Sequence, residues 1–291
     1  MSTTDQTLPP AWEPLTPRGV AAFAGASLRR LLLVQFIIAV LAAAVVVWTL
    51  QVAWFPVVRE AIRQLPVKGE IAAQQLVWTD ATPVQLAGNH FLGLAVDLNH
   101  GGELGREAQL QVEFGRKNVR VFSLLGYQIV EYPAGWRVAF NRTELGPWWG
   151  AWEPGILAGA AFGTVAGLML TWTLLATLYC LPVRLITFLQ NRDLNLRQSW
   201  RVAGAALMPG ALFLTFAIFS YGLDLVDLIR LAGLAGLHFV IGWVYLFISP
   251  LFLPRIPALA GAKTNPFVPP PELKKEAAEK NPSAAGEKPA S

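Results

Sequence analysis

Four long apolar stretches constrain this chain more than any short motif does. They cover residues 31–55, 155–183, 202–223 and 231–253, and none has Lys, Arg, Asp or Glu in its central part. A helix needs roughly 20 mostly apolar residues to cross the hydrocarbon layer of a membrane. The sequence therefore predicts an α-helical integral membrane protein with four transmembrane helices.

The composition agrees with this prediction, because 54% of the residues are hydrophobic and only 14% are charged. The first apolar stretch is too long for a removable signal peptide and lacks the small-residue cleavage pattern. We therefore expect it to remain as a signal anchor. The single cysteine, Cys180, excludes an intramolecular disulfide, so the domain between the first two helices must fold without one.

Basic residues in the short flanks of the helices predict their orientation, since cytoplasmic loops carry an excess of Lys and Arg. These residues are Arg18, Arg29 and Arg30 before the first stretch, and Arg184, Arg192, Arg197 and Arg201 after the second. The outer loop 224–230 has two aspartates and one arginine, whereas residues 254–291 include Arg255 and five lysines. We expect a multi-pass protein of the bacterial cytoplasmic (inner) membrane, with both termini in the cytoplasm.

This orientation divides the chain into segments on the two sides of the membrane. Residues 1–30 and 184–201 are expected to be cytoplasmic, with a short interfacial helix over 20–30, and residues 254–291 to form a disordered cytoplasmic tail. Residues 56–154 are expected to be extracytoplasmic, and their nine basic and ten acidic residues make them nearly neutral. The net charge of +4 then reflects the cytoplasmic bias, and we expect no nucleic-acid partner.

The extracytoplasmic segment 56–154 has its own pattern of hydrophobic residues. After Pro56, apolar residues recur at helical spacing to residue 65, which predicts an amphipathic helix lying on the membrane or on the domain. Residues 108–114 alternate strictly between polar and apolar, which is typical of a strand. Further strands are expected at 91–98, 118–124, 127–132 and 136–141. The sequence predicts a small β-rich (α+β) domain with a mostly antiparallel sheet of four to six strands.

Four glycines of the second apolar stretch lie four residues apart, and small residues at this spacing let transmembrane helices approach closely. They are Gly155, Gly159, Gly163 and Gly167. The pattern favours packing within the bundle, and a seam between two copies of the chain is the alternative.

Two residues of the later helices suggest transport as another reading. Pro209 interrupts the third apolar stretch and predicts a kink, which transporters can use to expose backbone carbonyls. His238 is the ionisable side chain that lies well within a predicted span. The plainer interpretations are a kink that serves packing and a neutral histidine bonded to a neighbouring helix.

Tryptophans gather where the first helix ends and the second begins, and indoles favour the membrane interface. They are Trp54, Trp148, Trp149 and Trp152. An interfacial belt is the main interpretation, and a carbohydrate or lipid platform is the alternative.

Histidines and acidic residues of the outer segment invite comparison with metal sites. His90, Asp97 and His100 lack the further ligands that calcium or zinc would require, so a turn after a strand is favoured at 99–102. The chain also has no hydrolase, metalloprotease or phosphate-loop motif. We therefore predict no catalytic residues, no cofactor and no metal.

Three short motifs resemble a known family. They are Leu-Thr-Pro-Arg-Gly-Val at 15–20, the strand that ends in Val96 and Asp97, and Gln-Ser-Trp-Arg-Val at 198–202 leading to Pro209. Together they are similar to uncharacterised bacterial integral membrane proteins with a domain of unknown function, related to the Yip1-like four-helix membrane proteins. The resemblance spans about residues 15–255 and implies a four-helix fold with an extracytoplasmic insert and a cell-envelope location. It implies no activity.

These observations favour a non-enzymatic membrane protein that acts as an accessory, assembly or sensing subunit in the cell envelope. Its expected partners are the lipid bilayer and other membrane or envelope proteins, with a homo-oligomer as a further possibility. The alternative is a small transporter or channel component that uses the kinked third helix and His238.

Overall fold

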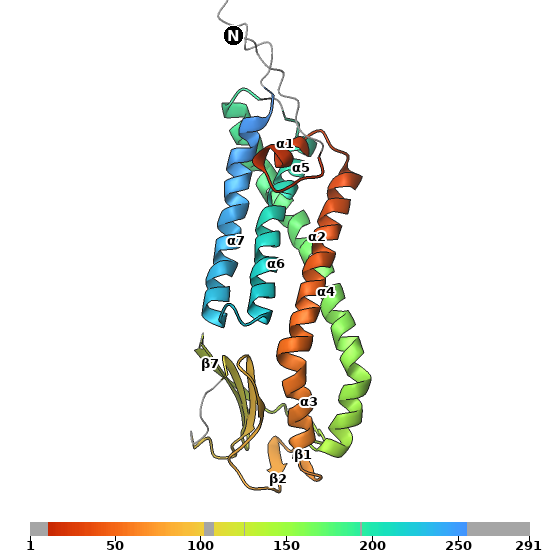
Figure 1. The fold of residues 1–291 in the computed structure, drawn as a ribbon, viewed down its shortest axis with the longest axis vertical. Helices are drawn as coiled ribbons and strands as arrows, with labels where there is room; N and C mark the ends of the chain where they lie inside the picture. Colours follow the sequence, from red (N-terminus) through yellow and green to blue (C-terminus); the bar gives the residue numbers. More distant parts are fainter. Residues whose placement is uncertain (1–10, 102–107, 125, 193, 255–291) are drawn as a thin grey trace, which may run out of the picture.

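The structure, a computed structural model, describes residues 11–101, 108–124, 126–192 and 194–254. It has a bundle of helices at one end and a small sheet domain at the other, as Figure 1 shows. Four helices are long and apolar enough to cross a membrane, by their length and composition: Leu28–Gln64, Arg142–Leu189, Leu196–Gly222 and Leu228–Phe252. The predicted tail at 255–291 and residues 1–10 lie outside the described part.

The first long helix starts in the bundle and reaches into the sheet domain. α2 (Leu28–Thr49) passes through a π-helical turn, η1 (Leu50–Trp54), into α3 (Phe55–Gln64). Because Pro56 has no N–H, the α-helical hydrogen bonding is interrupted here, and Phe55 N instead bonds back to Leu50 O. The amphipathic segment predicted after Pro56 is therefore a continuation of the same helix, and it packs on strands β3 (Val84–Gly88) and β4 (Leu92–Val96).

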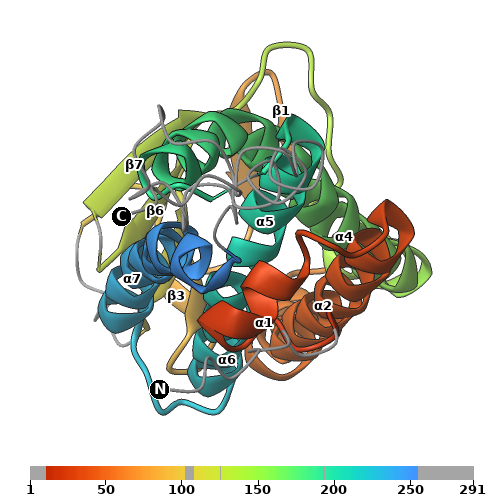
Figure 2. The same ribbon diagram turned by 90° about the horizontal axis from the view of Figure 1, so that it is seen from above.

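The short helix predicted at 20–30 begins and ends earlier in the sequence, at Pro17–Ala22. α1 (Pro17–Ala22) is capped by Thr16, whose side chain accepts a hydrogen bond from Gly19 N, and α2 is capped by Ser27. Val20 and Phe23 are fully buried in the main core of the bundle. α1 therefore lies across the end of the bundle and closes it, as the view from that end in Figure 2 shows.

α4 (Arg142–Leu189) is the longest element and starts 13 residues before the predicted span at 155–183. Its 48 residues would measure about 72 Å at 1.5 Å per residue, more than twice the ~30 Å of a hydrocarbon layer. Its first turns stand beside α3, where Arg59 pairs with Glu153 at 3.6 Å and the rings of Phe55 and Trp149 meet edge to face. α3 and the start of α4 thus form a two-helix stalk that holds the sheet domain.

The third apolar stretch forms two helices. α5 (Leu196–Ala206) begins with a capping box between Asn195 and Gln198, and α6 (Met208–Gly222) follows after Leu207 with Pro209 in its first turn. α7 (Leu228–Ile248) is capped by Asp227 and continues into a 3₁₀ turn, η2 (Ser249–Phe252). α2 packs against α4 and α6, α4 also against α5, and α6 against α7.

The sheet domain contains a hairpin and a five-stranded sheet. The hairpin pairs β1 (Gly69–Ala72) with β2 (Gln75–Trp78). The sheet has the order β3-β4-β5-β6-β7, with the strands Val84–Gly88, Leu92–Val96, Leu110–Phe114, Asn118–Ser123 and Gly126–Glu131. Its neighbouring strands are antiparallel except β4 and β5, which are parallel.

The predicted strand at 136–141 is wrong. This segment forms a single bridge, between Val138 and Ile71, because Asn141 already caps α4 by accepting a hydrogen bond from Glu144 N. One face of the sheet packs with α3 around Leu86, Val96 and Ala61, and this is the core of the domain. The structure confirms the helix-rich fold with four long apolar helices and a small sheet.

Candidate functional site

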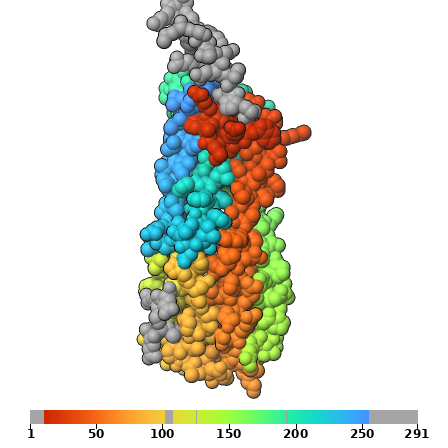
Figure 3. Space-filling model, in the orientation of Figure 1, coloured from red at the N-terminus to blue at the C-terminus, as the bar shows by residue number. Residues whose placement is uncertain are grey.

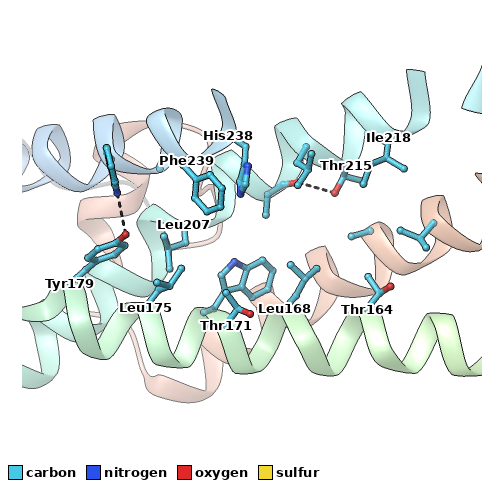
Figure 4. A pocket seen from close by; sticks show the side chains of 17 residues that line it. Thr164, Leu168, Thr171, Leu175, Tyr179, Leu207, Thr215, Ile218, His238 and Phe239 are labelled. Atoms are coloured by element: carbon cyan, nitrogen blue, oxygen red, sulfur yellow. Dashed lines mark hydrogen bonds between the residues drawn. The ribbon is translucent and has the colours of Figure 1, made fainter. Parts of the chain in front are cut away.

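A cavity of about 220 Å³ lies inside the helix bundle and is the first candidate site. Residues of α2, α4, α6 and α7 line it, together with Leu207 from the break between α5 and α6. Most of these side chains are aliphatic or aromatic, and Figure 4 shows them projecting from the surrounding helices toward a common space. The cavity suits an apolar group and offers few polar contacts.

His238 is the titratable side chain that lines this cavity along with Tyr179. Its Nδ1 contacts the carbonyl oxygen of Ala235 in the preceding turn of α7, and its ring lies 3.8 Å from that of Phe239, centroid to centroid. Nε2 has no hydrogen-bond partner among the described residues. An imidazole whose Nδ1–H donates to its own helix leaves Nε2 as one acceptor for a ligand.

Hydroxyl groups also line the cavity, and their hydrogen bonds are mostly local. Thr164 and Thr215 each donate to the carbonyl four residues earlier at 2.8 Å, as threonines inside helices commonly do. The hydroxyl of Thr171, which also lines the cavity, makes no hydrogen bond within the described part of the chain. Trp243 Nε1 donates to Tyr179 Oη at 3.1 Å and joins α7 to α4 (Figure 4).

Small residues bring α6 and α7 together beside the cavity. A Cβ on Gly210 would lie 2.5 Å from His238 O and 3.5 Å from Gly242 N. Real Cβ atoms do not approach backbone so closely, so only glycine permits this contact. Gly210 directly follows Pro209 in the first turn of α6. This turn therefore packs directly on the backbone of α7 at His238, beside the cavity.

No carboxylate is among the described residues that line the bundle cavity with His238. The two aspartates just before α7 interact with other residues. Asp224 lies 3.3 Å from His90, and Asp227 caps α7 and pairs with Arg230. Within the described residues, no group of three or more His, Cys, Asp or Glu is placed to hold a metal ion. A proton relay from His238 through these aspartates has no support in the geometry.

The histidines of the sheet domain occupy separate places. His90 faces Asp224 of the loop after α6, whereas His100 contacts Glu113 and Asn118 on the sheet. A turn follows β4 at 97–100, because Asn99 N donates to Asp97 Oδ1 at 3.1 Å and His100 N bonds back to Asp97 O. It starts two residues before the turn predicted at 99–102, of which residue 102 lies outside the described part.

The glycine series of α4 lies on an open surface of this single chain. A Cβ on Gly159, Gly163 or Gly167 would meet nothing within 4 Å, and one on Gly155 would touch only Trp152 at 3.9 Å. The buried face of α4 is formed instead by residues of its second half, including Trp172, Ala176 and Cys180. In the structure, these glycines therefore do not pack against another described helix of the same chain.

The four tryptophans divide into two groups. Trp54 packs on the cluster of Ala53, Phe91 and Tyr221, where the sheet domain meets the ends of the helices. Trp149 lies against Phe55 on the stalk, while Trp148 and Trp152 are exposed beside each other, with ring centroids 6.4 Å apart.

The joint between the sheet domain and the bundle is a second candidate site, and sequence patterns gave no indication of it. Asn89 Nδ2 donates to Ala53 O in the π-helical turn at 2.7 Å, and its Oδ1 accepts from Phe91 N and Leu92 N. Gln109 Oε1 accepts from Leu228 N, at the start of α7, at 2.7 Å. Figure 3 shows the domain and the helix ends in continuous contact on this face.

Aromatic packing completes the joint. The rings of Phe91 and Tyr221 meet edge to face at 5.0 Å, and both side chains are buried with Ala53. The sheet domain therefore contacts the first, third and fourth apolar helices directly.

Comparison with known proteins gives no further identification. No family model matches the chain, no curated protein matches it, and no solved structure matches it. The resemblance to Yip1-like membrane proteins therefore stays a prediction from the sequence motifs.

Proposed function

We propose that this chain is a non-enzymatic protein of the bacterial cytoplasmic membrane that works as an accessory or sensing subunit. In this proposal the four apolar helices span the bilayer, and the sheet domain is displayed outside and engages another envelope protein. The joint carries the proposal, because it couples the domain to three helices instead of leaving it on a flexible tether. Asn89 and Gln109 bond the first and fourth apolar helices, and Phe91 packs on Tyr221 of the third.

The distribution of charge supports the proposed orientation. The six ion pairs of the described part all lie in the sheet domain, the stalk or the outer loop. At the opposite end, Arg18, Arg29, Arg184 and Arg197 pair with no described carboxylate. Uncompensated arginines near the ends of spans favour the cytoplasmic side.

Labelling of single cysteines tests the orientation. In a Cys180→Ser background, we expect Lys68→Cys on the exposed sheet side to react with a membrane-impermeant maleimide in spheroplasts. Arg197→Cys, which is exposed at the other end of the molecule, should react only after lysis. The reverse labelling pattern would contradict the orientation.

Site-specific photocrosslinking tests the accessory function. A photoreactive residue in place of Tyr127, on the exposed strand β7, should give discrete protein adducts at native expression. The same residue in place of Phe188, an exposed apolar residue of α4, should give no such adduct and serves as the control. Absence of adducts at Tyr127, together with turnover of a lipid or peptide by the purified protein, would overturn the proposal.

A small transporter or channel component is the second candidate, and the bundle cavity with the free Nε2 of His238 is the observation that favours it. If the protein transports a solute through this cavity, proteoliposomes should show a solute flux, and the flux should fall in the double variant His238→Ala, Pro209→Ala. Flux that is unchanged in the double variant would count against transport through this cavity.

A further inference from the structure

A pocket of about 560 Å³ lies on the face of the sheet opposite α3. It is formed by β5, β6 and β7 together with the residues that lead into β5. Its lining includes six polar, charged, aromatic or aliphatic side chains: Gln109, Gln111, Arg120, Phe122, Tyr127 and Ile129. The register of the strands places Gln111 opposite Phe122 and Arg120 opposite Ile129, so these side chains share one face of the sheet.

Gln109 presents an unpaired donor at this pocket. Its side chain is only 4% exposed, and its Oε1 is fixed by the hydrogen bond from Leu228 N. Nε2 is buried and has no acceptor within the described part of the chain. A buried polar group without a partner costs free energy, and such groups in folded proteins call for an explanation such as a ligand.

Arg120 adds a positive charge to the same pocket. Its Nε is buried without an acceptor among the described residues, and none of the ion pairs includes it. Glu113 lies opposite Arg120 in the register, yet its carboxylate contacts His100. Gln111 is only 3% exposed, and its side-chain amide makes no hydrogen bond to a described residue.

The rim of the pocket is apolar and open to a larger molecule. Tyr127 is 72% exposed and Ile129 is 48% exposed, and Tyr127 stacks with Phe122 at 6.3 Å between ring centroids. The pocket therefore combines a cation and amide donors with aromatic and aliphatic walls. No carboxylate is among its described lining residues.

We propose that this pocket binds an oxyanion, a phosphate or carboxylate group, with Arg120 and Gln109 Nε2 as its donors. Charge-assisted hydrogen bonds to such oxygens are stronger than neutral ones, and arginine matches their planar geometry. Because Gln109 also bonds the first residue of α7, the pocket adjoins the end of an apolar helix. The oxyanion can thus come from a soluble molecule or from the phosphodiester of a lipid headgroup.

The test uses the full-length protein in nanodiscs of zwitterionic phosphatidylcholine. Inorganic phosphate and benzoate are titrated by calorimetry, and in a second arm native mass spectrometry measures retention of phosphatidylglycerol from mixed nanodiscs. Loss of one charged hydrogen bond should weaken the binding by about tenfold or more in Arg120→Gln. Gln109→Glu keeps an acceptor for Leu228 N but replaces the donor by a negative charge, and should weaken binding similarly.

Arg137→Gln is the matched control, because Arg137 is an exposed arginine of the same domain that pairs with Glu70 outside the pocket. Circular dichroism and thermal unfolding establish that each variant is folded, and Arg120→Lys, which keeps the charge, should bind with intermediate affinity.

Selective loss of phosphate or benzoate binding in the pocket variants supports a soluble ligand, and selective loss of phosphatidylglycerol supports a lipid. Equal effects of Arg120→Gln and Arg137→Gln, or no binding to the wild-type protein in either arm, would overturn the proposal. The result does not depend on the proposed accessory function, whose crosslinking test is separate.

Discussion

The helix bundle and the sheet domain of this protein are held together in different ways. In the bundle, hydroxyls of Thr164, Thr173 and Thr215 return to their own helices, and close backbone contacts such as Gly210 against His238 join neighbouring helices. The sheet domain has a small core, buried polar contacts and ion pairs of its own, His100 with Glu113 and Arg137 with Glu70. In the proposed arrangement the bundle lies in lipid, where no hydrophobic force acts between helices and packing depends on close approach. The sheet domain then lies in water and relies on apolar burial and paired polar groups. Added atoms should therefore damage the bundle, and lost polar partners should damage the sheet domain.

The largest effect is expected at the contact between α6 and α7. Gly210→Ala places a Cβ 2.5 Å from a backbone oxygen and should destabilise the protein by about 1–3 kcal/mol, as overpacking typically does. Unfolding in detergent, followed by circular dichroism, measures the change. Gly163→Ala is the control, because its Cβ would meet nothing within 4 Å in the single chain. Equal stability of both variants would contradict the close contact.

The joint between the two regions is the next test. Asn89→Asp keeps the oxygen that accepts from Phe91 N and Leu92 N but removes the donor to Ala53 O. The unpaired carbonyl and the new charge should cost about 1–3 kcal/mol locally. Hydrogen exchange should accelerate at residues 50–55 and 89–92 and stay unchanged in α5.

Gln128→Glu on the exposed strand β7 introduces the same charge away from the joint and is the control for this experiment. If it accelerates exchange at the joint as much as Asn89→Asp does, the hydrogen bond to Ala53 is not what holds the two regions together.

Inside the sheet domain, Tyr132 tests the importance of buried polar contacts. Its Oη donates to Gly115 O at 2.9 Å, and burial raises the pKa of the phenol above its usual value of 10.0. Tyr132→Phe should lose about 1 kcal/mol at neutral pH. Because the unfolded state ionises first, the stability supplied by wild-type Tyr132 is present below pH 10 and lost as the pH rises above it. Urea unfolding between pH 8 and about 11 should therefore show the difference between the two proteins shrinking.

The smallest effect is expected for a hydrogen bond within the bundle. Trp243→Phe removes the donor to Tyr179 Oη, and interhelical hydrogen bonds of this kind are worth roughly 0.6 kcal/mol on average. A double-mutant cycle with Tyr179→Phe isolates the pairwise energy. A coupling larger than the loss in Tyr132→Phe would reverse the comparison between the two regions.

Local patterns were sufficient for the elements whose signal is local. Four apolar windows lie on the four long helices, alternation at 108–114 marks β5, and the β-branched and aromatic residues at 118–124 mark β6. The boundaries were less accurate, because α4 continues through residues that look like an interfacial loop. Three strands, β1, β2 and β3, are too short to give a clear alternation, and 136–141 was assigned as a strand although Asn141 starts a helix.

The sequence by itself determined that this chain has four apolar helices and a small, neutral, disulfide-free sheet domain, because hydrophobic periodicity and length are properties of single segments. Only the tertiary structure decided that β4 and β5 are parallel, that Asn89 and Gln109 dock the domain on the helix ends, and that Arg120 shares a pocket with Gln109. These contacts join residues far apart in the chain. Such contacts depend on how the faces of the sheet and the ends of the helices pack together, and no local sequence pattern determines that packing.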